Sequence, residues 1–335
     1  MKYFIIVGGV LLVAVSISTY FVFRSESPAT IDSTLSFQYK EEKMRWQQYF
    51  DGAPVGEVYA HFLETASALD YYAAHGLSHI IGEELYDREG WEGIAFCTQD
   101  FGFGCFHGFS GAALSDRGLG ATEKLSAACT NLQRGDYLGC IHGIGHGILA
   151  YVGNDNLVQA LVACESSQQD EVVGGCFGGV IMEYNYNTMQ SQSGIDLRPF
   201  SESDAYSPCG SLGDRYTPSC YYELPSWWYA SFEGTGAADS AGIFTRIGKL
   251  CSDIQDEASR TFCFRGTGNV VGPRSDVQVA RMKEWCDEMP TKNARDLCYA
   301  EALGHLLNSE DGTKELRALC ESKTVTFSSV CGPQR

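Results

Sequence analysis

The feature that most constrains this 335-residue chain is the regular spacing of its 14 cysteines. They form seven consecutive pairs, and the separation within a pair is 11 or 12 residues in six of them and 8 in the first. The first members of the pairs recur after 32 to 45 residues, a period that predicts a tandem repeat. The predicted disulfides are Cys97–Cys105, Cys129–Cys140, Cys164–Cys176, Cys209–Cys220, Cys251–Cys263, Cys286–Cys298 and Cys320–Cys331.

Each repeat has the pattern of a helical hairpin. In residues 154–184 an apolar-periodic helix ends near Cys164, a polar turn follows, and a second helix carries Cys176 in an early turn. Cysteines that flank the turn of two antiparallel helices can meet the Cα separation of about 5.5 Å that a disulfide needs. We therefore predict an all-α fold of about eight hairpins, seven of them closed by their own disulfide. The additional hairpin covers residues 54–85, where Ala73 stands in place of the second cysteine.

The period and the hairpin plan resemble the tetratricopeptide and Sel1-like class of helical repeats, including its disulfide-stapled secreted members. The glycine-rich second helices with their His-Gly steps also resemble the inner helices of closed α/α toroids such as lanthionine cyclase-like proteins. These resemblances imply either an open solenoid or a closed toroid. The toroid enzymes bind zinc through cysteines, whereas every cysteine here has a predicted disulfide partner.

The N-terminus carries an uncharged apolar run over residues 3–23. At about 1.5 Å per residue this run is long enough to cross a bilayer, and it continues beyond the one candidate signal-peptidase site at residues 16–18. The sequence predicts a transmembrane signal-anchor over 1–24, a linker over 25–45 and a repeat domain over 46–335. Because so many paired cysteines suit an oxidising compartment, the repeat domain is expected outside the cytoplasm of a single-pass cell-membrane protein.

The formal net charge of −18 limits the partners. So acidic a surface repels phosphate backbones, which argues against nucleic acid as a partner. The expected partners are the membrane, through the N-terminal helix, and a protein, peptide or glycan ligand on the repeat surface.

Five of the seven histidines recur at equivalent positions when the repeats are aligned on their second cysteine. The position two residues later holds His75, His107 and His142, and the position six residues later holds His79 and His146. Residues four apart share one face of a helix, so each of the two i, i+4 pairs presents two imidazoles together.

Imidazole pairs of this kind are suitable ligands for zinc, copper or iron. Glu83 continues the stripe of His75 and His79 by one more turn and is a further candidate ligand. His107, on the neighbouring helix, can complete a site with either pair, or all three helices can converge around one or two ions.

A purely structural role explains the same residues in another way. Small residues between the histidines, such as Gly108 and Gly143, allow close helix packing, and the imidazoles can then hydrogen-bond across to the next helix. The residues at equivalent positions of later repeats, Gly178 and Arg265 among them, do not form a metal site. Two functions therefore stay open: a binding or scaffold repeat protein with a histidine-rich metal site, or a metal-dependent enzyme that uses these histidines.

Overall fold

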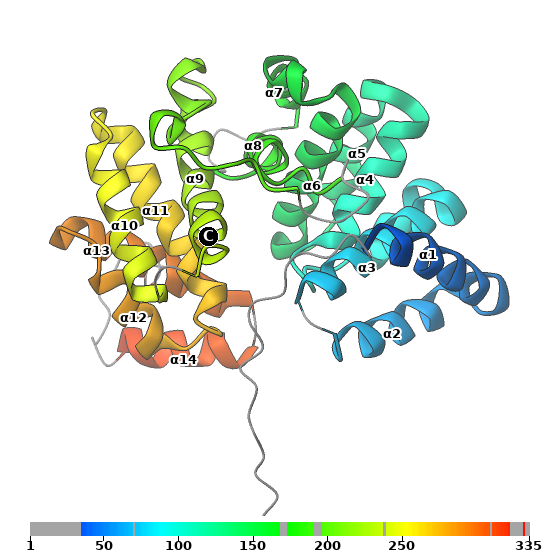
Figure 1. Cartoon of the computed structure of the whole chain (residues 1–335). Coiled ribbons are helices and arrows are strands. Elements are labelled where there is room, and N and C mark those ends of the chain that lie inside the picture. Colours follow the sequence, from blue (N-terminus) through cyan, green and yellow to red (C-terminus); the bar gives the residue numbers. More distant parts are fainter. Residues whose placement is uncertain are drawn as a thin grey trace, which may run out of the picture. The chain divides into compact units, whose positions relative to one another are not determined.

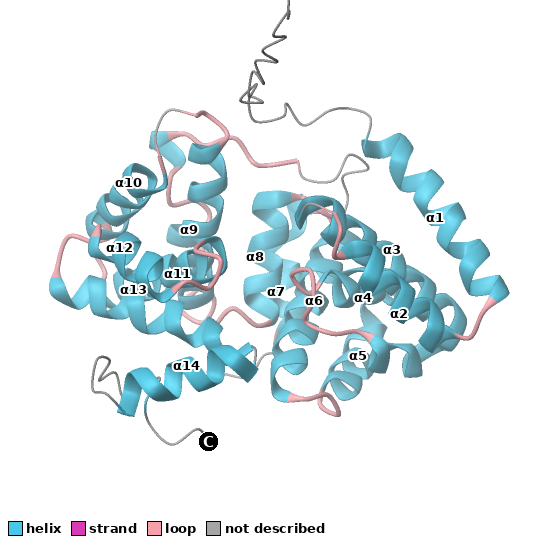
Figure 2. Cartoon of the chain, turned by 90° about the horizontal axis from the view of Figure 1, so that it is seen from below, coloured by secondary structure: helices cyan, strands magenta, loops and turns pink. Residues whose placement is uncertain are grey.

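The structure is a computed structural model that describes residues 35–69, 71–167, 173–189, 196–236, 239–308, 310–321 and 331. In this part of the chain there are fourteen α-helices and six short 3₁₀ helices, and no strand (Figures 1 and 2). The predicted all-α class is confirmed.

The first three helices are α1 (Leu35–Gly52), α2 (Val55–Ala66) and α3 (Tyr71–Glu89). Helices α2 and α3 form the hairpin that was predicted without a disulfide. Helix α1 begins inside the segment predicted as a linker, because its run of Lys, Glu, Gln, Met and Arg consists of good helix formers. It packs against α3, which carries the first histidine pair.

The repeats from Cys97 to Cys298 follow the hairpin plan, although the first member of two of them is a 3₁₀ helix instead of an α-helix, and the second member of the last predicted repeat lies outside the described residues. In chain order the elements are η1 (Gly90–Phe96), α4 (Gly104–Arg117), η2 (Gly118–Ala121), α5 (Thr122–Cys129), α6 (Arg134–Val152), η3 (Asn154–Asn156), α7 (Leu157–Cys164), α8 (Cys176–Tyr186), η4 (Glu202–Asp204), η5 (Cys209–Ser211), α9 (Thr217–Glu233), α10 (Ser240–Asp253), α11 (Glu257–Arg274), α12 (Val279–Asp287), α13 (Lys292–Gly304), η6 (His305–Asn308) and α14 (Glu310–Glu321).

All fourteen cysteines are paired, and the seven disulfides are the sequential ones. The Cα atoms of the bonded cysteines lie 5.4 to 5.7 Å apart, the separation expected at the closed end of a helical hairpin. Each bridge closes a short loop, which contributes about 2–3 kcal/mol in the chain-entropy model. The stability of a hairpin is therefore supported locally, by its own bridge.

The second helices of successive repeats pack against one another in an unbranched row of α3, α4, α6, α8, α9, α11 and α13 (Figure 2). Glycines allow the backbones in this row to come into contact. A Cβ atom on Gly108 would lie 1.9 Å from the carbonyl oxygen of His79, and one on Gly179 would lie 2.0 Å from that of His142. Gly108 thus sets the spacing of α3 and α4, and Gly179 sets that of α6 and α8.

The prediction of an N-terminal transmembrane helix needs correction. The apolar run at residues 3–23 lies outside the described residues, and among the helices that are described none combines the length and the apolarity needed to cross a membrane. The two longest, α3 and α6, both contain charged residues and histidines. The fold that we assign to the described residues is an array of helical hairpins, most of them closed by a disulfide.

Candidate metal site

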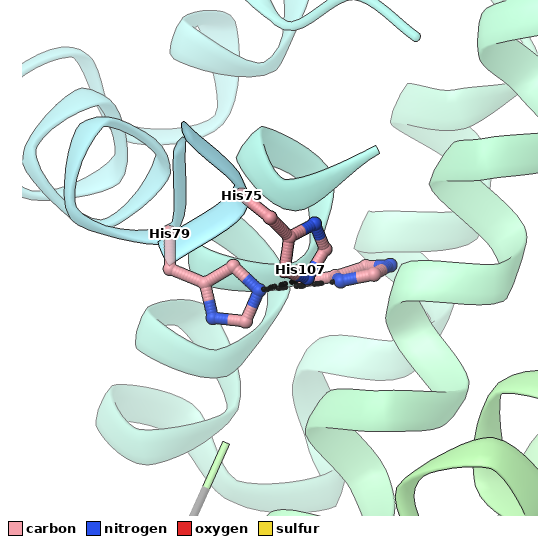
Figure 3. Close-up of side chains that lie close together, drawn as sticks. All are labelled: His75, His79 and His107. Carbon is pink, nitrogen blue, oxygen red and sulfur yellow. Dashed lines mark hydrogen bonds between the residues drawn. The ribbon is translucent and has the colours of Figure 1, made fainter. Parts of the chain in front are cut away.

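The five predicted histidines come together at the start of the helical row. We call His75 and His79 on α3, His107 on α4, and His142 and His146 on α6 the histidine cluster. Their ligand atoms form two groups of three that could each hold an ion, and within each group these atoms lie within 4.8 Å of one another. The first group is His75, His79 and His107 (Figure 3), the second is His107, His142 and His146.

In three of these rings Nδ1 faces an acceptor. His75 Nδ1 lies 2.8 Å from the carbonyl oxygen of Phe101, and His142 Nδ1 lies 2.9 Å from that of Gly174. His146 Nδ1 lies 2.9 Å from Glu183 Oε2. A carbonyl or carboxylate oxygen can only accept, so Nδ1 carries the hydrogen in each ring. When such a ring is neutral, its Nε2 has a free lone pair, which is the form that binds a metal.

The backbone that supplies two of these acceptors is unusual. Phe101 has φ 52° and Phe103 has φ 64°, a left-handed conformation that bulky residues rarely adopt. Gly174 has φ 90°, which glycine tolerates without cost. Both turns lie immediately before a helix of the row, α4 or α8, and each directs a carbonyl oxygen at a histidine of the preceding helix in the row.

The Nε2 atoms point toward one another. The Nε2 atoms of His142 and His146 are 3.1 Å apart, and those of His75 and His79 are 3.0 Å apart. His107 Nδ1 lies 3.3 Å from His79 Nε2 (Figure 3). Two nitrogens at about 2.05 Å from one tetrahedral ion would be about 3.4 Å apart, close to these separations.

The contact between His142 and His146 is the one that hydrogen bonding between neutral rings does not explain. Both rings have their hydrogen on Nδ1, so two lone pairs face each other at 3.1 Å. Either a cation lies between the two nitrogens or one ring carries a second proton. Burial, with the neighbouring His146 ring, lowers the pKa of His142 to about 3, which opposes the second proton at that ring and leaves His146, paired with Glu183, as the ring that could carry it.

Glu183 is the part of the site that the sequence analysis missed. It is fully buried on α8, and besides His146 it accepts from the backbone N–H groups of Thr188 and Met189 and from the Thr188 hydroxyl. Metal-binding histidines usually donate the hydrogen of their other ring nitrogen to a carboxylate or carbonyl oxygen, which fixes the orientation of the ring. The sequence feature that could have indicated Glu183 is that it is the single charged residue of α8.

Glu83, which the stripe pattern proposed as a ligand, belongs to neither of the two groups. Its two carboxylate oxygens accept from the Tyr39 hydroxyl at 2.6 Å and from the Lys43 ammonium group at 2.5 Å, both on α1. The two histidines outside the cluster also have other neighbours: His61 packs against Trp46, and His305 lies 3.2 Å from Asn269 Oδ1.

A second buried carboxyl group extends the site along the row. Glu223 on α9 is 4 % exposed, and burial raises its pKa to about 8, so that it is mostly protonated at neutral pH. A Cβ atom on Gly178 would lie 2.7 Å from Glu223 Oε1 and 3.6 Å from His142 Nδ1. The absent side chain of Gly178 therefore leaves space beside His142 that the Glu223 carboxyl group approaches.

The burial of the cluster predicts acid sensitivity of the metal-free protein. Burial lowers the pKa of His75 to about 4 and that of His142 to about 3, whereas the unfolded chain titrates near 6.5. Below pH 6.5 the unfolded state binds more protons than the folded state. The free energy of unfolding therefore decreases as the pH is lowered from 6.5 to the folded-state pKa values, by up to about 1.4 kcal/mol per pH unit for each histidine.

The measurement is the unfolding midpoint of chelator-treated protein between pH 7 and pH 4. We expect the pH dependence to be shallower in His142→Ala, because one of the titrating groups is gone. If the curves of the wild type and the variant run parallel, the histidine is not held neutral by burial.

Comparison of the chain with protein-family models, with curated proteins and with solved structures found no match. The resemblance to helical repeat classes therefore rests on the hairpin plan alone. The seven disulfides are typical of an extracellular or secreted protein, and the two histidine groups give it a site that could bind metal.

Proposed function

We propose that this protein is an extracytoplasmic helical repeat protein that binds a transition-metal ion, zinc or copper, through the histidine cluster. The observation that carries the proposal is the pair of Nε2 lone pairs of His142 and His146, which face each other at 3.1 Å while both Nδ1 atoms donate elsewhere. A cation turns this repulsive contact into coordination. Imidazole ligands suit zinc and copper, and no free thiolate competes for the ion.

The test is a zinc titration of the metal-free protein, followed by metal analysis after dialysis. Wild-type protein is expected to retain zinc, and His142→Ala/His146→Ala is expected to lose the ion of the second group. His305→Ala is the matched control, since this histidine lies in η6, directly after the last helix of the row, and outside the cluster. A wild type that takes up no zinc, or a double variant that retains as much as the wild type, contradicts the proposal.

The second candidate function is a metal-dependent enzyme. Each group supplies three ligands, and three protein ligands with one open position are typical of catalytic zinc sites. The mostly protonated carboxyl group of Glu223 approaches the space beside the Nδ1 side of His142 and is the candidate proton donor of such an enzyme.

Cobalt substitution separates a closed binding site from an open catalytic one. If a coordination position is open, azide will bind the Co²⁺-loaded protein and change its visible absorption spectrum. A spectrum that does not respond to azide favours the binding protein, because the ion then has no exchangeable ligand.

A further inference from the structure

We infer that the histidine cluster holds two metal ions and that His107 bridges them through its two ring nitrogens. The inference rests on the proposed function, and goes beyond it in the number of ions and in the role of one residue. His107 is the only residue common to the two three-histidine groups of the described part of the chain.

The two nitrogens of His107 have different surroundings. Nδ1 lies 3.3 Å from His79 Nε2 and so faces the first group (Figure 3). Nε2, on the other side of the ring, is buried and has no hydrogen-bond partner among the residues that the structure describes. A buried ring nitrogen without a partner costs about 1–3 kcal/mol, so its retention needs a reason.

The His107 ring also lies against the two rings of the second group. The His107 ring stacks on His146 with centroids 4.3 Å apart, and its centroid is 5.9 Å from that of His142. In that group His142 and His146 already present two Nε2 lone pairs. A nitrogen of His107 completes three ligands there, just as Nδ1 does with His75 and His79.

A bridging His107 also accounts for the number of histidine ligands. Five histidines are one short of two separate three-histidine sites, and a bridging ring counts twice. The two nitrogens of one imidazole are about 2.2 Å apart, so ions bound to both would be about 6 Å apart, far enough to limit their repulsion. The negative charge of the bridging imidazolate is shared by the two ions, and Glu183 behind His146 adds a carboxylate close to the second.

Bridging changes the protonation of His107 in a defined way. A neutral imidazole has one N–H, and coordination of both nitrogens requires that this proton leave to solvent. The ring becomes an imidazolate that donates one electron pair to each ion, and no electrons are transferred.

The experiment is a titration of the full metal-free protein with Cu²⁺, followed by metal analysis and electron paramagnetic resonance. We expect two ions per chain, with an integrated signal well below two spins, because an imidazolate couples two Cu²⁺ ions antiferromagnetically. The matched variant is His107→Phe, which keeps a ring in the stack on His146 but removes both nitrogens. It is expected to abolish the coupling while far-UV circular dichroism stays that of the wild type.

A second variant keeps the test decisive if His107→Phe does not fold. His75→Ala/His79→Ala removes the first group and leaves His107 as a ligand of the second, so we expect one ion and one full spin. Binding of a single ion by the wild type overturns the inference, and so does binding of two ions with two full spins. In both of these cases the proposed metal binding stands, whereas a wild type that binds no metal overturns the proposed function.

Discussion

Gly108→Ala is expected to destabilise the protein by about 3 kcal/mol or more, whereas Gly76→Ala stabilises it by about 1 kcal/mol. The two glycines both follow a histidine of the cluster, Gly108 on α4 and Gly76 on α3, but their surroundings differ. A Cβ atom on Gly108 would lie 1.9 Å from the carbonyl oxygen of His79, which is backbone and cannot move aside cheaply. A Cβ atom on Gly76 would meet nothing within 4 Å, so only the higher helix propensity of alanine remains.

Thermal unfolding of the two metal-free variants gives the comparison. We expect a melting temperature several degrees below the wild type for Gly108→Ala and slightly above it for Gly76→Ala. Because the methyl group on Gly108 forces α3 and α4 apart, it should also separate His79 from His107 and weaken metal uptake. Equal melting temperatures in the two variants would show that the close contact between α3 and α4 does not hold the site together.

Glu183→Gln is expected to weaken zinc binding by about 10- to 100-fold, the usual effect of removing an outer-shell carboxylate. The change preserves the shape of the side chain but alters its hydrogen bonding. If the amide nitrogen faces His146, it donates to Nδ1, moves the ring hydrogen to Nε2 and blocks coordination. If the amide oxygen faces His146, the amide nitrogen faces the N–H of Met189, and two donors then oppose each other. In the wild type this N–H donates to the Glu183 carboxylate at 2.9 Å.

Glu83→Gln is the matched control, since Glu83 is the carboxylate that follows the histidine stripe in the sequence. Its oxygens are engaged by Tyr39 and Lys43, so we expect the zinc affinity to stay that of the wild type. Competition with a chromophoric chelator measures both affinities, and circular dichroism reports whether each variant is folded. If Glu83→Gln weakens binding more than Glu183→Gln does, the ligand set is the one that the stripe pattern predicted.

Glu83 and Glu183 show which features of the site can be predicted from the sequence and which cannot. The i, i+4 spacing places Glu83 on the same face as His79 whatever surrounds the helix. What the carboxylate then binds depends on α1, which begins at Leu35 inside the segment predicted as a linker and brings a lysine to it. Glu183 has no such local relation to a histidine, because it reaches His146 from another helix 37 residues away.

By itself the sequence determined the properties that depend on local spacing. The interval between paired cysteines predicts the hairpins and their disulfides, and the register of the histidines predicts that each i, i+4 pair shares a face, since both follow from helix geometry over a few residues. Which nitrogen of His75, His142 and His146 faces the other rings depends on the tertiary structure. That choice is made by the carbonyl oxygens of Phe101 and Gly174 and by the carboxylate of Glu183. These acceptors come from later repeats and reach the rings only because glycines let the helices approach to backbone contact.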